Sequence, residues 1–195
     1  NVTAIDVKNA RADGIALTNC NNDQISDSSV SYSGVSGIYA NTTSSSSCLT
    51  ISGNTVSQSD TGHGIHVVNV SNFSVTNNTI GSIASDTTSP REAMGIQLCG
   101  PTFANSTVSG NTISNASYDG IAVLFAGATP GPLTISHNTI SNCMLRLDDG
   151  GGIYLNGNMS STVVEHNLVH SLPGSYDGMP TGASTCHTVG IYSDA

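Results

Sequence analysis

A segment near residue 60 holds the side chains of this chain that are best suited to proton transfer. His63 and His66 flank a Gly-Ile pair and Asp60 precedes them, while Tyr39 lies just after the previous pair and Arg91 just before the next. A histidine oriented by a carboxylate can act as a general base, and an arginine can neutralise an acidic group on the substrate. This set would suit removal of a proton beside the carboxylate of a uronate sugar. Two histidines on a surface turn are the alternative.

A repeat that runs through the whole chain sets the positions of these side chains. Seven Gly-Ile pairs recur, and behind six of them follows a second segment, such as ISGNTV or ISHNTI. Between 14 and 18 residues separate each glycine from the aligned polar residue of that second segment. Such repetition is typical of a solenoid, in which each repeat stacks on the next. The pairs begin at Gly14, Gly37, Gly64, Gly95, Gly120, Gly152 and Gly190.

One coil, residues 119–142, illustrates the expected local structure. DGIAVLF, LTIS and the segment that begins at Thr139 have the character of three short strands, with Ile121 and Val123 on one face of the first. Pro and Gly in GATPGP mark a turn, and the i, i+3, i+4 spacing of helices is absent from the chain. We therefore predict an all-β fold. It is a single-stranded right-handed parallel β-helix of about seven coils, in one continuous domain over residues 1–195.

The polar residue of the second segment is asparagine in five of its six copies. At a coil spacing of about 4.8 Å, these side chains could form a hydrogen-bonded ladder at one bend of the helix. Such a ladder would satisfy buried amides, which otherwise cost a few kcal/mol each. The predicted ladder consists of Asn54, Asn78, Asn111, Asn138 and Asn167.

The Gly-Ile and asparagine repeats resemble those of the pectate-lyase-like superfamily of right-handed parallel β-helices, over nearly the whole chain. That superfamily includes polysaccharide lyases, glycoside hydrolases, uronan epimerases, phage tailspikes and surface adhesins, so the resemblance implies a fold and no single activity. Its catalytic members place their site on the first strand of each coil and on the loops before it. GHG at residues 62–64 is similar to a motif of β-helix polygalacturonases, but their NTD and RIK motifs are absent. Any activity should therefore be of the lyase or epimerase type, not two-carboxylate hydrolysis.

The residue after each Gly-Ile pair is expected to point outward and to align in a column. Three tyrosines, a histidine and a glutamine in this column would suit a saccharide chain, because aromatic rings stack on sugar faces and polar tips bind hydroxyl groups. Tyrosine is also a favoured strand residue, so the column has a structural alternative. We expect His66, His63, Arg91 and Tyr39 as catalytic residues, and Gln97, Tyr154, Tyr192, Glu92 and Asp119 as substrate-binding residues.

Several carboxylates precede a repeat glycine by one to four residues and should line one edge of the stack. Oxygen ligands that converge there could bind calcium, and the candidates are Asp119, Asp148 and Asp149. Solvated carboxylates are the alternative, and the expected chemistry requires no cofactor.

Five cysteines occur, and none of them forms a CxxC pair that would indicate a zinc or redox site. Alignment on the repeat predicts two disulfides, Cys20–Cys48 and Cys143–Cys186, which leaves Cys99 unpaired. Five separate thiols that behave as small hydrophobic side chains are the alternative.

Composition excludes several classes of partner. The net charge is −9 and only four residues are Lys or Arg, so the basic surface that nucleic acids require is missing. No apolar run is long enough for a membrane helix, so membrane insertion is not expected. Scarce Lys and Arg and abundant Ser and Thr favour an extracellular or cell-surface location.

Two interpretations of function remain open. In the first, the chain is an extracellular β-helix that binds or acts on a polysaccharide or cell-surface glycan, with uronan lyase or epimerase chemistry at most. In the second, it is a non-catalytic stalk, tailspike-like or filament segment. The repeat runs close to both ends without a recognisable cap, so we expect a fragment of a longer protein or end-to-end, homo-oligomeric association.

Overall fold

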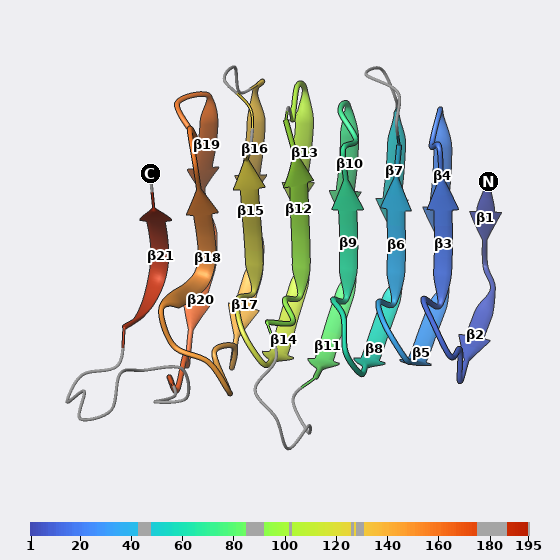
Figure 1. Cartoon of the computed structure of the whole chain (residues 1–195), viewed down its shortest axis with the longest axis horizontal. Coiled ribbons are helices and arrows are strands. Elements are labelled where there is room, and N and C mark those ends of the chain that lie inside the picture. Colours follow the sequence, from blue (N-terminus) through green and yellow to red (C-terminus); the bar gives the residue numbers. More distant parts are fainter. Residues whose placement is uncertain are drawn as a thin grey trace.

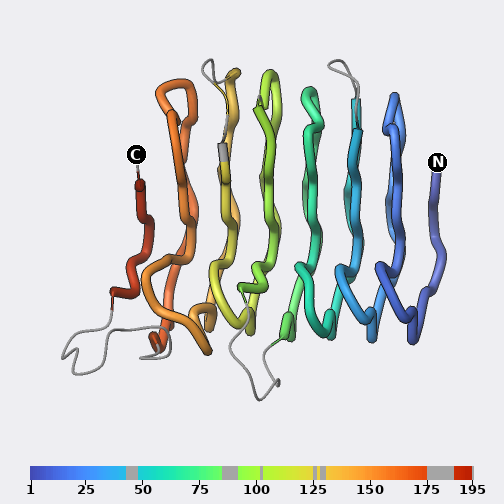
Figure 2. Tube along the Cα trace, viewed as in Figure 1, coloured from blue at the N-terminus to red at the C-terminus, as the bar shows by residue number. Residues whose placement is uncertain are grey.

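Three parallel sheets run the length of the molecule and enclose one elongated core (Figure 1). The computed structural model describes residues 1–42, 48–84, 92–101, 103–125, 127, 131–174 and 187–194. Each coil gives one strand to sheet A, then to sheet B, then to sheet C, and the chain then enters the next coil (Figure 2). The prediction of an all-β parallel β-helix with three short strands per coil is confirmed.

Seven strands form each sheet, and each strand pairs in parallel with its counterparts in the neighbouring coils. Sheet A contains β1 (Val2–Thr3), β4 (Asp23–Ser26), β7 (Leu49–Ser52), β10 (Phe73–Thr76), β13 (Ser106–Ser109), β16 (Leu133–Ser136) and β19 (Thr162–Glu165). Sheet B contains β2 (Asp6–Lys8), β5 (Ser29–Ser33), β8 (Thr55–Ser59), β11 (Thr79–Ile83), β14 (Thr112–Ala116), β17 (Thr139–Ser141) and β20 (Leu168–His170). Sheet C contains β3 (Ile15–Thr18), β6 (Ile38–Asn41), β9 (Ile65–Val68), β12 (Ile96–Gly100), β15 (Ile121–Phe125), β18 (Gly150–Asn156) and β21 (Thr188–Asp194).

The core consists of β-branched and leucine side chains that alternate with outward polar residues. In β7, Leu49 and Ile51 are buried while Thr50 and Ser52 face outward. Because side chains alternate along a strand and successive coils keep their register, each inward residue stacks on its equivalent. One such stack in sheet A contains Ile25, Ile51, Val75, Val108 and Ile135.

Packing at the corner between sheets B and C requires the glycine in six of the seven Gly-Ile pairs. A Cβ atom added to Gly64 would lie 2.4 Å from Cγ2 of Ile80 and 2.5 Å from the carbonyl oxygen of Gly95. Equivalent contacts occur at five other repeat glycines, whereas a Cβ at Gly190 in the last coil meets nothing within 4 Å. The glycine therefore leaves room for a β-branched side chain of sheet B, and its backbone needs no unusual φ.

The predicted asparagine ladder is present at the bend between sheets A and B. Nδ2 of Asn78 donates to Oδ1 of Asn111 at 3.0 Å, and Nδ2 of Asn111 donates to Oδ1 of Asn138 at 2.9 Å. The backbone N–H of each of these residues donates to the same oxygen of the next, and each Nδ2 also donates to a carbonyl oxygen in sheet A. Asn54 and Asn167 continue the ladder at its two ends, and Ser28 takes the asparagine position in the preceding coil.

The predicted disulfide between Cys20 and Cys48 is wrong, because both are free thiols. The register pairs Asp23 with Leu49, so Cys48 lies beside Asn22 and not beside Cys20. Cys20 instead turns inward, and its Sγ donates to the carbonyl oxygen of Asn41 at 3.3 Å. Cys143 is a buried free thiol, and its predicted partner, Cys186, lies outside the described residues.

The described residues include no helix that is long and apolar enough to cross a bilayer.

Candidate functional site

Strand register on sheet C aligns all seven members of the predicted column, although two of them, Gln97 and Ala122, are buried. Tyr39 pairs with His66, His66 with Gln97, and the register continues to Tyr154 and Tyr192. Neighbouring coils lie about 4.8 Å apart, so an elongated ligand could contact several of these side chains at once. We call this surface the sheet C face. Its column, in order, is Ala16, Tyr39, His66, Gln97, Ala122, Tyr154 and Tyr192.

Three of the expected catalytic side chains meet at the N-terminal half of the sheet C face. The ring centroids of Tyr39 and His66 are 5.4 Å apart, and those of His63 and His66 are 4.7 Å apart, both edge to face. Aromatic pairs favour this geometry, because the positive edge of one ring meets the negative face of the other. The fourth expected residue, Arg91, lies outside the described residues.

His63 is held as a neutral imidazole. Its Nδ1 accepts a hydrogen bond from the backbone N–H of Met94 at 3.1 Å, so any ring proton resides on Nε2. Burial lowers the pKa of His63 to about 3, and the neighbouring His66 adds to the effect. A group with so low a pKa is a weak base at neutral pH, so His63 is suited to positioning more than to proton abstraction.

His66 has a different electrostatic environment, in which a carboxylate opposes burial. Burial lowers the pKa of His66, and the negative charge of Asp13 acts in the opposite direction. Oδ1 of Asp13 accepts a hydrogen bond from the backbone N–H of Ser36 at 2.9 Å, which fixes this carboxylate. Sequence reasoning proposed Asp60 for this role and missed Asp13, although Asp13 precedes a repeat glycine directly, as Asp119 does.

A second group of side chains lies at the C-terminal half of the sheet C face. The rings of Tyr154 and Tyr192 are 5.4 Å apart and edge to face. The hydroxyl group of Tyr154 donates to Oδ2 of Asp194 at 2.8 Å and accepts from Nδ2 of Asn156 at 3.1 Å. These contacts fix the tyrosine ring on the surface, as a binding platform requires.

Asp119 is a fully buried carboxyl group beneath the edge of this second group. Its Oδ1 accepts a hydrogen bond from the backbone N–H of Gly151 at 2.7 Å, and its Oδ2 has no hydrogen-bond partner among the described residues. Burial raises the pKa of Asp119 from 3.8 to about 7, with smaller contributions from the charges of Glu92 and Asp149. Asp119 was expected to contact substrate, but its complete burial leaves it no surface for that contact.

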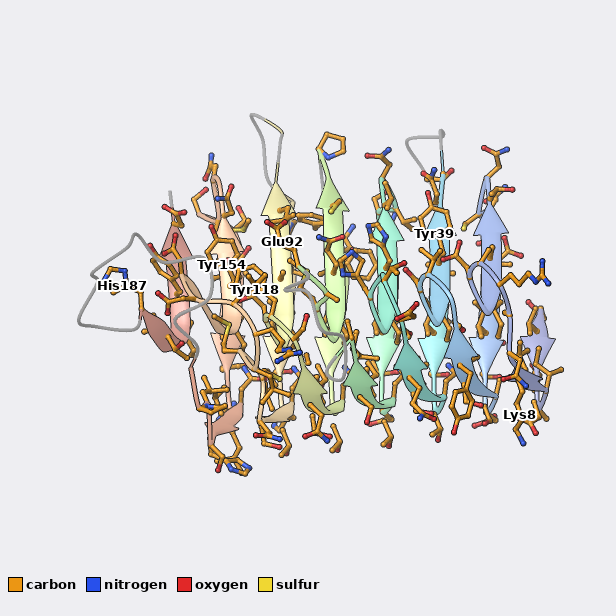
Figure 3. All side chains as sticks on the ribbon, turned by 60° about the horizontal axis from the view of Figure 1, so that its bottom comes forward. Lys8, Tyr39, Glu92, Tyr118, Tyr154 and His187 are labelled. Carbon is orange, nitrogen blue, oxygen red and sulfur yellow. The ribbon has the colours of Figure 1, made fainter. Side chains whose placement is uncertain are left out.

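Tyr118 was not singled out from the sequence, and it is half-buried directly before Asp119 in the chain. Its hydroxyl group donates to the carbonyl oxygen of Asp149 at 2.7 Å, and burial raises its pKa. Glu92 and Tyr154 lie near enough to Tyr118 to contribute to that shift, and Figure 3 shows these three side chains close together and away from Tyr39. The tyrosine directly before Asp119 in the sequence was the available signal.

The predicted calcium site gains no geometric support. Over the described part of the chain, no three His, Cys, Asp or Glu side chains come together as metal binding would require. Asp119 is buried with a raised pKa, Asp148 is buried, and Asp149 is exposed. Calcium binding by these residues stays a prediction.

A comparison with protein families supports the fold. A family model described as a right-handed beta helix region matches residues 1–169. Searches of curated proteins and of solved structures gave no match.

Proposed function

Because the chain belongs to the right-handed β-helix family, we propose that it is an extracellular glycan-binding protein whose ligand lies along the sheet C face. The observation that carries this proposal is the aligned column in which Tyr39 and His66, and then Tyr154 and Tyr192, form two aromatic pairs. Their edge-to-face contacts fix the rings. Gln97, expected to bind substrate, is buried between the two pairs, and its Nε2 donates to Sδ of Met94 at 3.6 Å.

The charges around the face favour an uncharged glycan. Asp13 lies near His66, and Asp149 and Asp194 lie near Tyr192, with Glu92 near Tyr118. Carboxylates repel the acidic groups of a polyuronate, and the repulsion strengthens where water is partly excluded. A neutral oligosaccharide avoids this cost. Its hydroxyl groups can donate hydrogen bonds to these carboxylates, and they can donate to or accept from the tyrosine hydroxyl groups.

Binding is better supported than catalysis. Uronate chemistry needs a base beside the substrate, yet His63, with a pKa of about 3, is a weak base. Lyase or epimerase activity would have to use His66 or Tyr39 as its base. A purely structural segment, the other alternative, would not require a fixed aromatic column.

Titration with soluble neutral oligosaccharides, followed by calorimetry, tests the proposal. We expect binding by the unmodified chain, and a loss of about tenfold or more in affinity, equivalent to about 1.4 kcal/mol, for His66→Ala and for Tyr154→Ala. Thr107→Ala is the matched control, because Thr107 faces outward from β13 on sheet A. Absence of binding across a panel of cello-, xylo-, manno- and chito-oligosaccharides, or equal loss in the control, would contradict a glycan site on the sheet C face.

A further inference from the structure

A separate groove lies at the corner where the chain leaves sheet B for sheet C, in the first three coils. It follows strands β2, β5 and β8, at the lower right of Figure 1. Its volume is about 420 Å³, within the range of roughly 300–1,000 Å³ that is common for small-molecule sites. The turn that contains Gly34 and Gly37 separates it from Tyr39 on the sheet C face.

The groove is lined by residues that strand register places side by side. Lys8 pairs with Ser31, and Ser31 pairs with Ser57, so the residues that follow them, Asn9, Tyr32 and Gln58, align across three coils. All three side chains are exposed, and Tyr32 is 54% exposed. An aromatic ring thus stands between two amide groups at a spacing of about 4.8 Å on each side.

The backbone at Tyr32 makes a bulky side chain unexpected there. Its φ is +57°, in the left-handed region, which asparagine tolerates and bulky residues seldom adopt. The same column of the β-helix has φ between 54° and 58° in every coil, and asparagine or serine occupies five of its seven positions. Tyr32 therefore carries a backbone cost that an asparagine would reduce, while its ring packs little against the core.

The remaining residues keep the groove open and polar. Gly34, Ser33 and Ser59 are small, and a Cβ on Gly34 would lie 2.4 Å from the carbonyl oxygen of Arg11. Asp60 is exposed and contributes a carboxylate that can accept two hydrogen bonds from neighbouring hydroxyl groups. The carboxylate disfavours an anionic ligand.

From this geometry we propose that the Tyr32 groove is a second binding site, for a neutral saccharide. The ring of Tyr32 stacks on an apolar sugar face, and the amides of Asn9 and Gln58 with the carboxylate of Asp60 bind its hydroxyl groups. This site does not depend on the sheet C face, since the two surfaces share no residue. If both are occupied, one chain holds two glycan strands, and multivalent binding follows without any further contact.

Tyr32→Asn is the decisive variant, because asparagine suits the left-handed backbone and should leave the melting temperature unchanged or raise it. We expect cellohexaose, xylohexaose or mannohexaose to shift the backbone amide resonances of Asn9, Tyr32, Gly34, Gln58 and Asp60. Tyr32→Asn should weaken that binding at least about tenfold, and Asp60→Asn should weaken it less.

Tyr154→Ala, on the sheet C face, separates the two sites and should leave the shifts at the groove unchanged. Groove shifts that persist in Tyr154→Ala would support the groove as a site of its own, even if the sheet C face binds no glycan. The proposal is overturned if none of the three hexasaccharides shifts the groove resonances, or if Tyr32→Asn binds as tightly as the unmodified chain.

Discussion

Nδ1 of His63 accepts a hydrogen bond of 3.1 Å from the backbone N–H of Met94, one coil further along the stack. His63, one of the four side chains expected to be catalytic, therefore connects two coils. The bond needs a free lone pair on Nδ1, so it holds only while the imidazole is neutral. Protonation would break this link and leave a buried backbone donor without its acceptor.

His63 should remain neutral through the physiological pH range. Its pKa is about 3 in the folded chain and 6.5 when exposed, so the unfolded chain binds the extra proton as pH falls below 6.5. The stabilising contribution is complete above pH 6.5 and is lost as pH falls toward 3. Two-dimensional ¹H–¹⁵N spectra should show the Nε2–H tautomer from pH 5 to 8. The glutamine oxygen in His63→Gln can keep the acceptor and remove this pH dependence. Titration of His63 near 6.5 would contradict the assignment.

Asp119 should act on stability in the opposite direction. Its pKa is about 7 in the folded chain against 3.8 when exposed, so the folded chain retains a proton that the unfolded chain has lost. Its contribution is complete below pH 3.8 and falls as pH rises to 7, by up to about 1.4 kcal/mol per pH unit. Asp119→Asn keeps an acceptor for the Gly151 N–H, and it should reduce the dependence of the melting temperature on pH between pH 4 and 7. Identical pH slopes for the two proteins would show that Asp119 ionises as an exposed carboxyl group does.

Gly64→Ala should destabilise the stack because its methyl group would collide with Ile80 and with the backbone of Gly95. Overpacking of this kind costs about 1–3 kcal/mol, which urea unfolding can resolve. Gly190→Ala is the matched control, since a Cβ there meets nothing within 4 Å, and its effect should lie within about 0.5 kcal/mol. Comparable losses in the two variants would mean that the glycine serves backbone flexibility and not packing.

Asn111→Ala should cost more than any surface change. It removes the acceptor of the Asn78 backbone N–H and the donor to the carbonyl oxygen of Val75, both buried. Each orphaned group costs about 1–3 kcal/mol, so a total loss of about 3 kcal/mol or more is expected in urea unfolding. Asn167→Ala, at the less buried end of the ladder, provides the comparison and should lose clearly less. An equal loss at both positions would mean that the cost of losing a ladder asparagine does not depend on its burial.

The frame of this protein follows from its sequence because each coil repeats the same packing problem. Ile121 stacks on Ile96 in the core, and Asn138 bonds to Asn111 in the ladder. Because the same residue types recur at these positions in each coil, both roles can be predicted from the repeat. The outward column could be predicted as well, since side chains in a strand alternate between its two faces.

The contents of the site depended on contacts between coils that the repeat does not encode. The burial of Asp119 results from packing of the segment at Tyr118 and Gly150, where a Cβ on Gly150 would lie 2.4 Å from Oδ1 of Asp119. The disulfide prediction failed for a related reason. Alignment by repeat position places Cys20 and Cys48 near each other, but the register along the strands does not.

The asparagine ladder gives the stack a direction as well as cohesion. Every ladder amide has its oxygen toward the preceding coil and its N–H toward the following one, from Asn54 through Asn138. The side-chain dipoles therefore add head to tail, with the positive end at Asn167, where Nδ2 donates to the carbonyl oxygens of Ile135 and Glu165. At the opposite end, Oδ1 of Asn54 accepts the backbone N–H of Ser28, so the same direction continues into the preceding coil. The ladder thus acts as a polarity marker, and two such stacks placed in antiparallel orientation could not continue it.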